Sequence, residues 1–105
     1  MASFLRFMLG FYVPVKDPRF KLVFNVPVEK VEACKMAVFA AGAGKNGNYG
    51  DCCWTVIGTG QFLPYVGANP NIGSVGQLEK VEEARVETLC IGEDVARKAV
   101  EALKE

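Results

Sequence analysis

The stretch GKNGNYGDCCWTVIGTGQFLPYVGANPNIGSVGQLEKVEEARVE, residues 44–87, holds eight of the eleven glycines of the chain. Each glycine loses more backbone entropy on folding than another residue would, so the stretch is expected to contain special turns or close approaches. Residues 52–57 (CCWTVI) are β-prone and predict a strand, which we expect to end at residues 58–60. A loop over residues 61–76 then leads to a long strand over residues 77–91.

The strand expected over residues 77–91 gathers charges on one face near its middle. Glu83, Arg85 and Glu87 are two residues apart, so their side chains point to the same side of a sheet. They could pair across a subunit interface, remain solvated, or line a binding cleft. A catalytic carboxylate pair is disfavoured, because no nucleophile or base partner is evident.

Regular structure is expected on both sides of this stretch. Residues 20–26 (FKLVFNV) alternate between apolar and more polar positions and predict a strand. Pro27 ends that strand and suits the first turn of a helix over residues 28–41, and Gly42 and Gly44 supply its C-terminal cap. A second amphipathic helix is expected over residues 93–104.

The first fifteen residues are apolar, with Arg6 as their single charge. Alternation over residues 7–13 favours a strand, followed by a turn at residues 16–19. A targeting segment is the alternative, although no small-residue cleavage site follows and the run is too short to span a bilayer.

The predicted order is strand, strand, helix, strand, strand, helix. At 105 residues the chain is expected to be one domain, 1–105, with residues 1–19 as an N-terminal extension. Two helices can cover one face of an antiparallel sheet, which predicts an α+β fold with the ferredoxin-like split βαβ arrangement. Because 50% of the residues are hydrophobic, we expect the other face to meet another subunit.

The composition excludes several classes of function. Lys and Arg number 12, as do Asp and Glu, so the net charge of zero favours neither nucleic acid nor an anionic membrane as a partner. There is no histidine, which rules out histidine-based acid–base catalysis and histidine-ligated metals. Gly58, Thr59 and Gly60 lack the spacing of a dinucleotide-binding fingerprint, GxxxxGK[ST] does not occur, and no cofactor is identified.

The four cysteines are expected to be reduced thiols rather than a disulfide framework. Cys34 and Cys90 lie in apolar patterns, and the adjacent Cys52 and Cys53 would point to opposite faces of a strand. This usage favours a reducing, cytoplasmic location. Cys52 and Cys53 are weak candidates for a soft metal or for redox chemistry, against the simpler interpretation of one packed and one exposed thiol.

Four motifs in the central stretch carry a resemblance to a known family. They are GNYxxCxW at 47–54, GTGQFxP at 58–64, GANPxIGxxG at 67–76 and ExVEExRVE at 79–87. Together they resemble the small domain inserted in Nif-three-like proteins, which also occurs as a standalone chain. That domain is similar to the CutA and PII signalling proteins, which implies a ferredoxin-like homotrimer with its open sheet faces turned inward.

The chain departs from the family pattern at both ends. The pattern continues after the last helix with a His-Pro-Tyr-Glu-Glu run into a final strand, whereas this sequence ends at Glu105. Conversely, residues 7–15 precede the first strand of the pattern. We expect the N-terminal strand to take the place of the missing strand, antiparallel beside residues 20–26.

The resemblance also suggests where a ligand would bind. In PII-like relatives the loop between the second and third strands and the clefts between subunits carry ligand and partner contacts. By position this implies residues 61–76 as the ligand loop. The polar candidates are Lys45, Asn48, Tyr49, Gln61 and Asn69, and the charged strand adds Glu83, Arg85 and Glu87.

The sequence therefore predicts a non-enzymatic, trimeric binding or regulatory module of PII/CutA type. A small hydrolase or cyclohydrolase, or a metal-binding protein, is the first alternative. A purely structural oligomerisation or partner-docking domain is the second.

Overall fold

The computed structural model describes residues 6–9, 18–69 and 73–104, and it confirms the expected order of elements. The elements are β1 (Arg6–Leu9), β2 (Arg19–Pro27), the 3-10 turn η1 (Val28–Lys30), α1 (Val31–Ala40), β3 (Cys53–Phe62), β4 (Glu79–Ile91) and α2 (Glu93–Leu103). The helix expected from residue 28 thus opens with a 3-10 turn, as helix N-termini often do. The fold is α+β.

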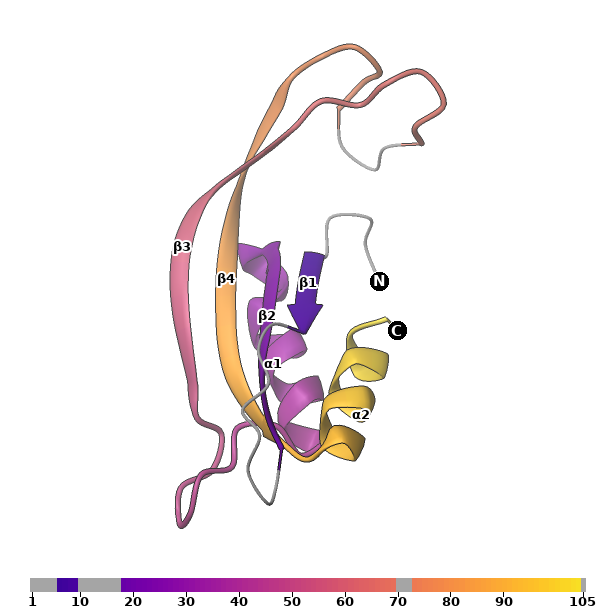
Figure 1. The fold of residues 1–105 in the computed structure, drawn as a ribbon. Coiled ribbons are helices and arrows are strands. Elements are labelled where there is room, and N and C mark those ends of the chain that lie inside the picture. Colours follow the sequence, from indigo (N-terminus) through magenta and orange to yellow (C-terminus); the bar gives the residue numbers. More distant parts are fainter. Residues whose placement is uncertain (1–5, 10–17, 70–72, 105) are drawn as a thin grey trace.

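The three long strands form an antiparallel sheet, with β4 between β2 and β3. The short β1 pairs antiparallel with the other edge of β2, which makes the order β1-β2-β4-β3. Both helices lie on the same face of this sheet (Figure 1). The expected strand beside β2 is therefore confirmed for residues 6–9, and the rest of the N-terminal prediction, residues 1–5 and 10–17, lies outside the described residues.

The hydrophobic core lies between the helices and one face of β2 and β4. Leu22, Phe24 and Val26 alternate along β2 and are fully buried, as the period of two predicts. From β4 the core receives Ala84 and Val86, opposite Val26 and Phe24, and Cys90, opposite Phe20. The helices complete the core with Val31, Cys34, Val38, Ala96, Ala99 and Leu103.

The expected end of β3 at residues 58–60 is wrong. The strand continues to Phe62, and Gly58 and Gly60 pair with Glu83 and Val81 of β4. Neither glycine has a positive φ. Both therefore adopt an ordinary extended backbone conformation, and the ladder of hydrogen bonds continues past them. The loop expected over residues 61–76 accordingly begins two residues later, and β4 begins at Glu79 rather than at residue 77.

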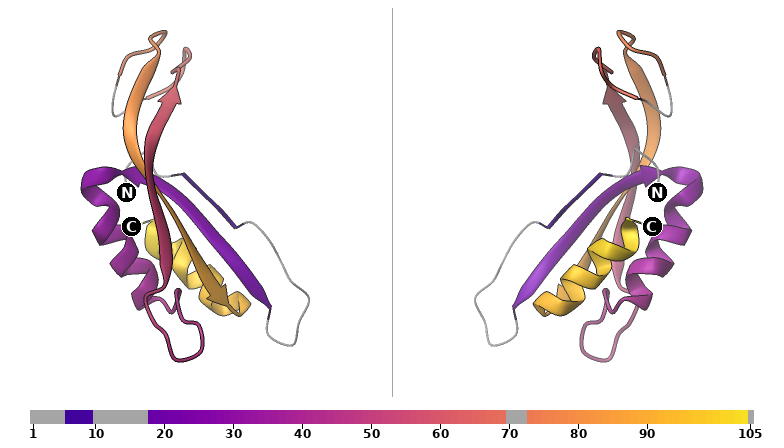
Figure 2. Two further views of the ribbon diagram at one scale, coloured as in Figure 1. Left: turned by 90° about the vertical axis from the view of Figure 1, so that its left-hand side faces the viewer. Right: turned by 90° about the vertical axis from the view of Figure 1, so that its right-hand side faces the viewer.

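The far part of the β3–β4 pair extends beyond the rest of the sheet. Pro27, the last residue of β2, pairs with Glu83, so the ladder from Thr59–Glu82 to Phe62–Glu79 has no β2 neighbour. Figure 2 shows this ribbon reaching past both helices in two views. Within the described parts of the chain, neither helix has the length and apolar character needed to cross a bilayer.

Candidate functional site

The sheet face that the helices leave uncovered is called the open face, and the ladder register decides which side chains share it. Lys21 pairs with Leu89, and Trp54 pairs with Glu87, so these four residues lie on one side. The same register adds Asn25 and Val56, both opposite Arg85, and Gly58, opposite Glu83. Each of the three long strands therefore contributes to this face.

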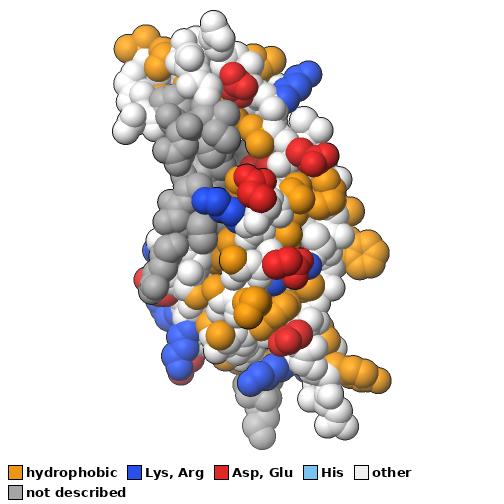
Figure 3. Space-filling model, turned by 180° about the vertical axis from the view of Figure 1, so that it is seen from behind, with side chains coloured by type: hydrophobic (Ala, Val, Ile, Leu, Met, Phe, Trp, Pro, Cys, Tyr) orange, Lys and Arg blue, Asp and Glu red, His pale blue; other side chains and the backbone are white. Residues whose placement is uncertain are grey.

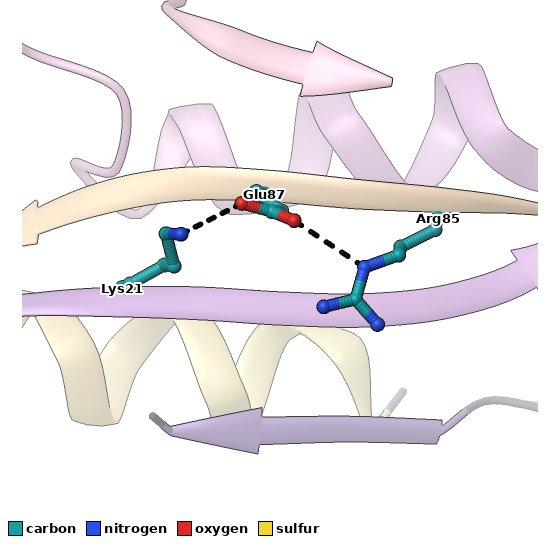
Figure 4. A network of polar contacts seen from close by, with 3 residues as sticks. All are labelled: Lys21, Arg85 and Glu87. Atoms are coloured by element: carbon teal, nitrogen blue, oxygen red, sulfur yellow. Dashed lines mark hydrogen bonds and ion pairs between the residues drawn. The ribbon is translucent and has the colours of Figure 1, made fainter. Parts of the chain in front are cut away.

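A charged network joins β2 to β4 at the middle of the open face (Figure 4). The Lys21 ammonium lies 2.9 Å from one carboxylate oxygen of Glu87, and Arg85 Nε donates to the other oxygen at 3.3 Å. Hydrogen bonds from Lys21 and then from Arg85 hold the pKa of Glu87 below its usual value. Glu87 is thus an ionised, doubly partnered carboxylate, which suits structural or binding roles better than proton transfer.

A small hollow adjoins this network on the side toward the β3–β4 extension. It has a volume of about 160 Å³ and lies where Gly58 leaves β3 without a side chain, opposite the nearly buried Glu83. Its other walls come from all three long strands. They are Asn25, Val56, Thr59, Gly60 and Arg85.

A second hollow lies at the other end of the open face. It has a volume of about 340 Å³, and Lys21, Trp54 and Glu87 line it together with Cys52 and Cys53. Thr88, a further lining residue, donates through Oγ1 to the Cys52 carbonyl at 2.7 Å. This bond ties the start of β3 to β4.

The predicted site residues do not form one cluster. Lys45, Asn48 and Tyr49 are exposed in the turn before β3, where Asn46 and Tyr49 form a backbone bridge. Gln61 and Asn69 lie toward the opposite end of β3 and in the loop that follows it (Figure 1).

Glu83, Arg85 and Glu87 share the open face as predicted, and Arg85 contacts Glu87. Lys21 and Asn25 were not predicted to be their neighbours. Alternation along residues 20–26 already placed those two on one side, but only the β2–β4 register brings them beside the charged strand.

All four cysteines are free thiols, as expected, in two different environments. Cys34 and Cys90 are buried in the core, and burial raises the pKa of both thiols, that of Cys90 to about 11. Cys53 is exposed and Cys52 partly exposed. Among the described residues, no group of three or more His, Cys, Asp or Glu side chains is placed to hold a metal ion.

Thiol alkylation in native buffer at pH 8 is expected to modify Cys52 and Cys53 and to spare Cys34 and Cys90. The thiolate is the reactive form, and burial suppresses both access and ionisation at the two core positions. Intact-mass spectrometry should show two adducts, rising to four after unfolding in urea. Two unreactive cysteines at positions 52 and 53 would remove a redox role from consideration.

Known proteins resemble this chain over most of its length. No protein-family model matches it. The "GTP cyclohydrolase 1 type 2 homolog" of Mycobacterium leprae is 54% identical over 69 residues, which are 66% of this chain and 18% of that protein. The protein of the same name from Bacillus subtilis is 47% identical over 73 residues, 70% of this chain and 20% of that protein.

A solved structure extends the likeness to nearly the whole fold. The crystal structure of a Bacillus cereus protein related to NIF3 superposes with a TM-score of 0.69 at 33% identity, covering 97% of this chain and 25% of that one. The chain therefore spans about a fifth to a quarter of the length of these relatives. It is homologous to a small portion of the NIF3-related proteins, the GTP cyclohydrolase 1 type 2 homologs.

Proposed function

We propose that this chain is a ferredoxin-like domain of PII/CutA type that forms a homotrimer and acts as a non-enzymatic binding or regulatory module in the cytoplasm. The strand order β1-β2-β4-β3, with both helices on one face, supports this assignment. In it, β2, β3 and β4 take the first three strand positions of the split βαβ fold. The short β1 takes the edge position beside β2 that the final strand would occupy.

The observation that carries the proposal is the chemistry of the open face. It combines the Lys21–Glu87–Arg85 network with apolar side chains that face solvent, of which Trp54 is 68% and Val56 48% exposed. Exposed aromatic groups and arginine are enriched at protein interfaces. Three such faces turned inward would cover one another and leave clefts between subunits for a ligand.

An enzyme is the alternative that the names of the relatives suggest. Those names refer to GTP cyclohydrolase, but this chain spans only about a fifth of the proteins that bear them. The chain has no histidine, and the carboxylate at the centre of its open face is held ionised between two cations. These features favour binding over catalysis. The third candidate function is a purely structural docking domain, which would present the same kind of interface-like face.

Light scattering and thermal-shift measurements separate the three functions. We expect a particle of three times 11.4 kDa at micromolar concentration. We also expect a rise in Tm with at least one member of a panel of GTP, ATP and divalent cations, because a ligand of the folded state stabilises it. A monomer contradicts the trimer, and turnover of GTP supports the enzyme. An intact trimer that no ligand stabilises favours the structural module.

A further inference from the structure

Gly58 lies in the middle of β3, where the fold of a single copy does not require a glycine. Its φ is not positive, and a Cβ atom added there would meet no other atom within 4 Å. A β-branched residue would suit an extended strand better. A glycine inside a strand often marks a place where a ligand or another chain approaches closely.

The hollow over Gly58 is too small for most ligands. Its volume of about 160 Å³ falls below the roughly 300–1,000 Å³ of typical small-molecule pockets. It is of a size to receive one large side chain. Val56 offers it an apolar wall, and Asn25 and Glu83 line it with polar groups that can accept a hydrogen bond.

Trp54 is a side chain suited to such a hollow. It lies on the same face as Gly58, about 13 Å along the strand, and it does not line the hollow of its own copy. The residue is 68% exposed. Tryptophan is enriched among the residues that dominate interface energies, and its Nε1–H group needs an acceptor when buried.

The surface of the chain favours a second copy as the partner. The chain exposes 6755 Å², about 1,000 Å² more than the roughly 5,800 Å² expected for a compact monomer of 11.4 kDa. That excess is similar to the ~800 Å² that each partner buries in a standard interface. The net charge is zero, and acidic, basic and apolar side chains are interspersed on the surface (Figure 3), so two copies would not repel each other.

The open face is also electrostatically self-complementary. Arg85 donates a hydrogen bond to Glu87 through Nε, and its two terminal nitrogens point away from that carboxylate (Figure 4). The same face carries the carboxylates of Glu83 and Glu87. A second copy can therefore bring acceptors to Arg85 as well as an aromatic ring to the hollow.

We propose that Trp54 of a second copy of this chain inserts into the hollow over Gly58, and that Gly58 lacks a side chain in order to admit it. In a closed ring each copy donates one indole and receives one. The inference rests on the self-association proposed above and names the contact that drives it. The indole stacks over the Gly58 backbone against Val56, with its Nε1–H toward Asn25 and Glu83.

The single tryptophan makes the contact directly observable. Tryptophan emission of the wild-type protein should shift to shorter wavelength as concentration rises through the association range, in step with the mass from light scattering. Gly58→Val fills the hollow but keeps Trp54, so its emission should remain that of a solvent-exposed indole. Self-association of this variant should weaken by about 30-fold or more, as for a lost interface hot spot.

Gly50→Val is the matched control, because Gly50 also has no positive φ and no atom within 4 Å of its Cβ position, and it lies outside the open face. It should associate like the wild type, and far-UV circular dichroism should show both valine variants folded. Trp54→Ala should weaken association as Gly58→Val does, whereas Met36→Ala, on the exposed side of α1, should not.

The outcomes separate this inference from the proposed function. A wild-type protein that associates without a shift in emission, or a Gly58→Val variant that associates normally, overturns the inserted tryptophan and leaves the trimer standing. A wild-type protein that stays monomeric overturns both.

Discussion

Replacing Phe24 with alanine is expected to lower the free energy of unfolding by about 3–5 kcal/mol, the range for removing a large buried aromatic side chain. Phe24 lies on β2 between the sheet and the helices, and among the described residues it is the largest of the fully buried side chains. Since a domain of this size is stable by only about 5–15 kcal/mol, the variant should lose a large share of its stability and unfold at a much lower urea concentration than the wild type. Urea denaturation followed by far-UV circular dichroism measures the change.

Met36→Ala is the control for that experiment. Met36 lies in α1 and is 71% exposed, so its truncation should change the free energy of unfolding by no more than about 0.5 kcal/mol. A loss below about 1 kcal/mol for Phe24→Ala would contradict the core described above. Equal losses for the two variants would do so as well.

Gly44→Ala is expected to destabilise the fold by about 2–4 kcal/mol through strain and a steric clash together. Gly44 has a φ of +81°, and an added Cβ would come within 2.9 Å of the Phe39 ring and 3.0 Å of the Cys52 backbone nitrogen. The residue also ties α1 to the sheet: its N–H donates to the Leu89 carbonyl at 2.7 Å, and its carbonyl accepts from the Cys52 N–H at 2.8 Å.

Alanine substitutions at two other glycines distinguish the backbone strain from the steric clash. Gly47 has a φ of +60° with no atom within 4 Å of its Cβ position, so Gly47→Ala should show the backbone strain alone, about 1 kcal/mol. Gly50→Ala should show neither effect, since its φ is not positive and its surroundings are open. The same urea denaturation ranks the three variants, and Gly44→Ala no worse than Gly47→Ala would exclude the clash.

Periodic sequence patterns predicted strands and helices correctly wherever one side of the element faces the core. The alternation over residues 20–26 predicted β2 and its buried side, and the apolar pattern around Cys34 agrees with the burial of that residue on α1. Both succeed because burial imposes a period of two on strands and about 3.6 on helices. The cysteines follow the same logic, since those within apolar patterns are the buried ones.

The length of β3 could not be predicted from such a pattern. Its glycines looked like a strand end, because glycine is common in turns and the helices bury little of this edge strand to impose alternation. Pairing with β4 decides the matter: the ladder continues to Phe62 opposite Glu79. Hydrogen bonds between strands far apart in the sequence override the local preference of Gly58 and Gly60.

Local pattern thus determined the order of elements, the core and the charged side of β4, because each depends on residues within one turn or one strand. Residues 44–87 also carried the relationship to the NIF3-related proteins. The meeting of Lys21 with Glu87, the hollow over Gly58 and the exposure of Trp54 depended on the tertiary structure. Each results from the register between strands separated by a helix or a long loop, and no local spacing encodes that register.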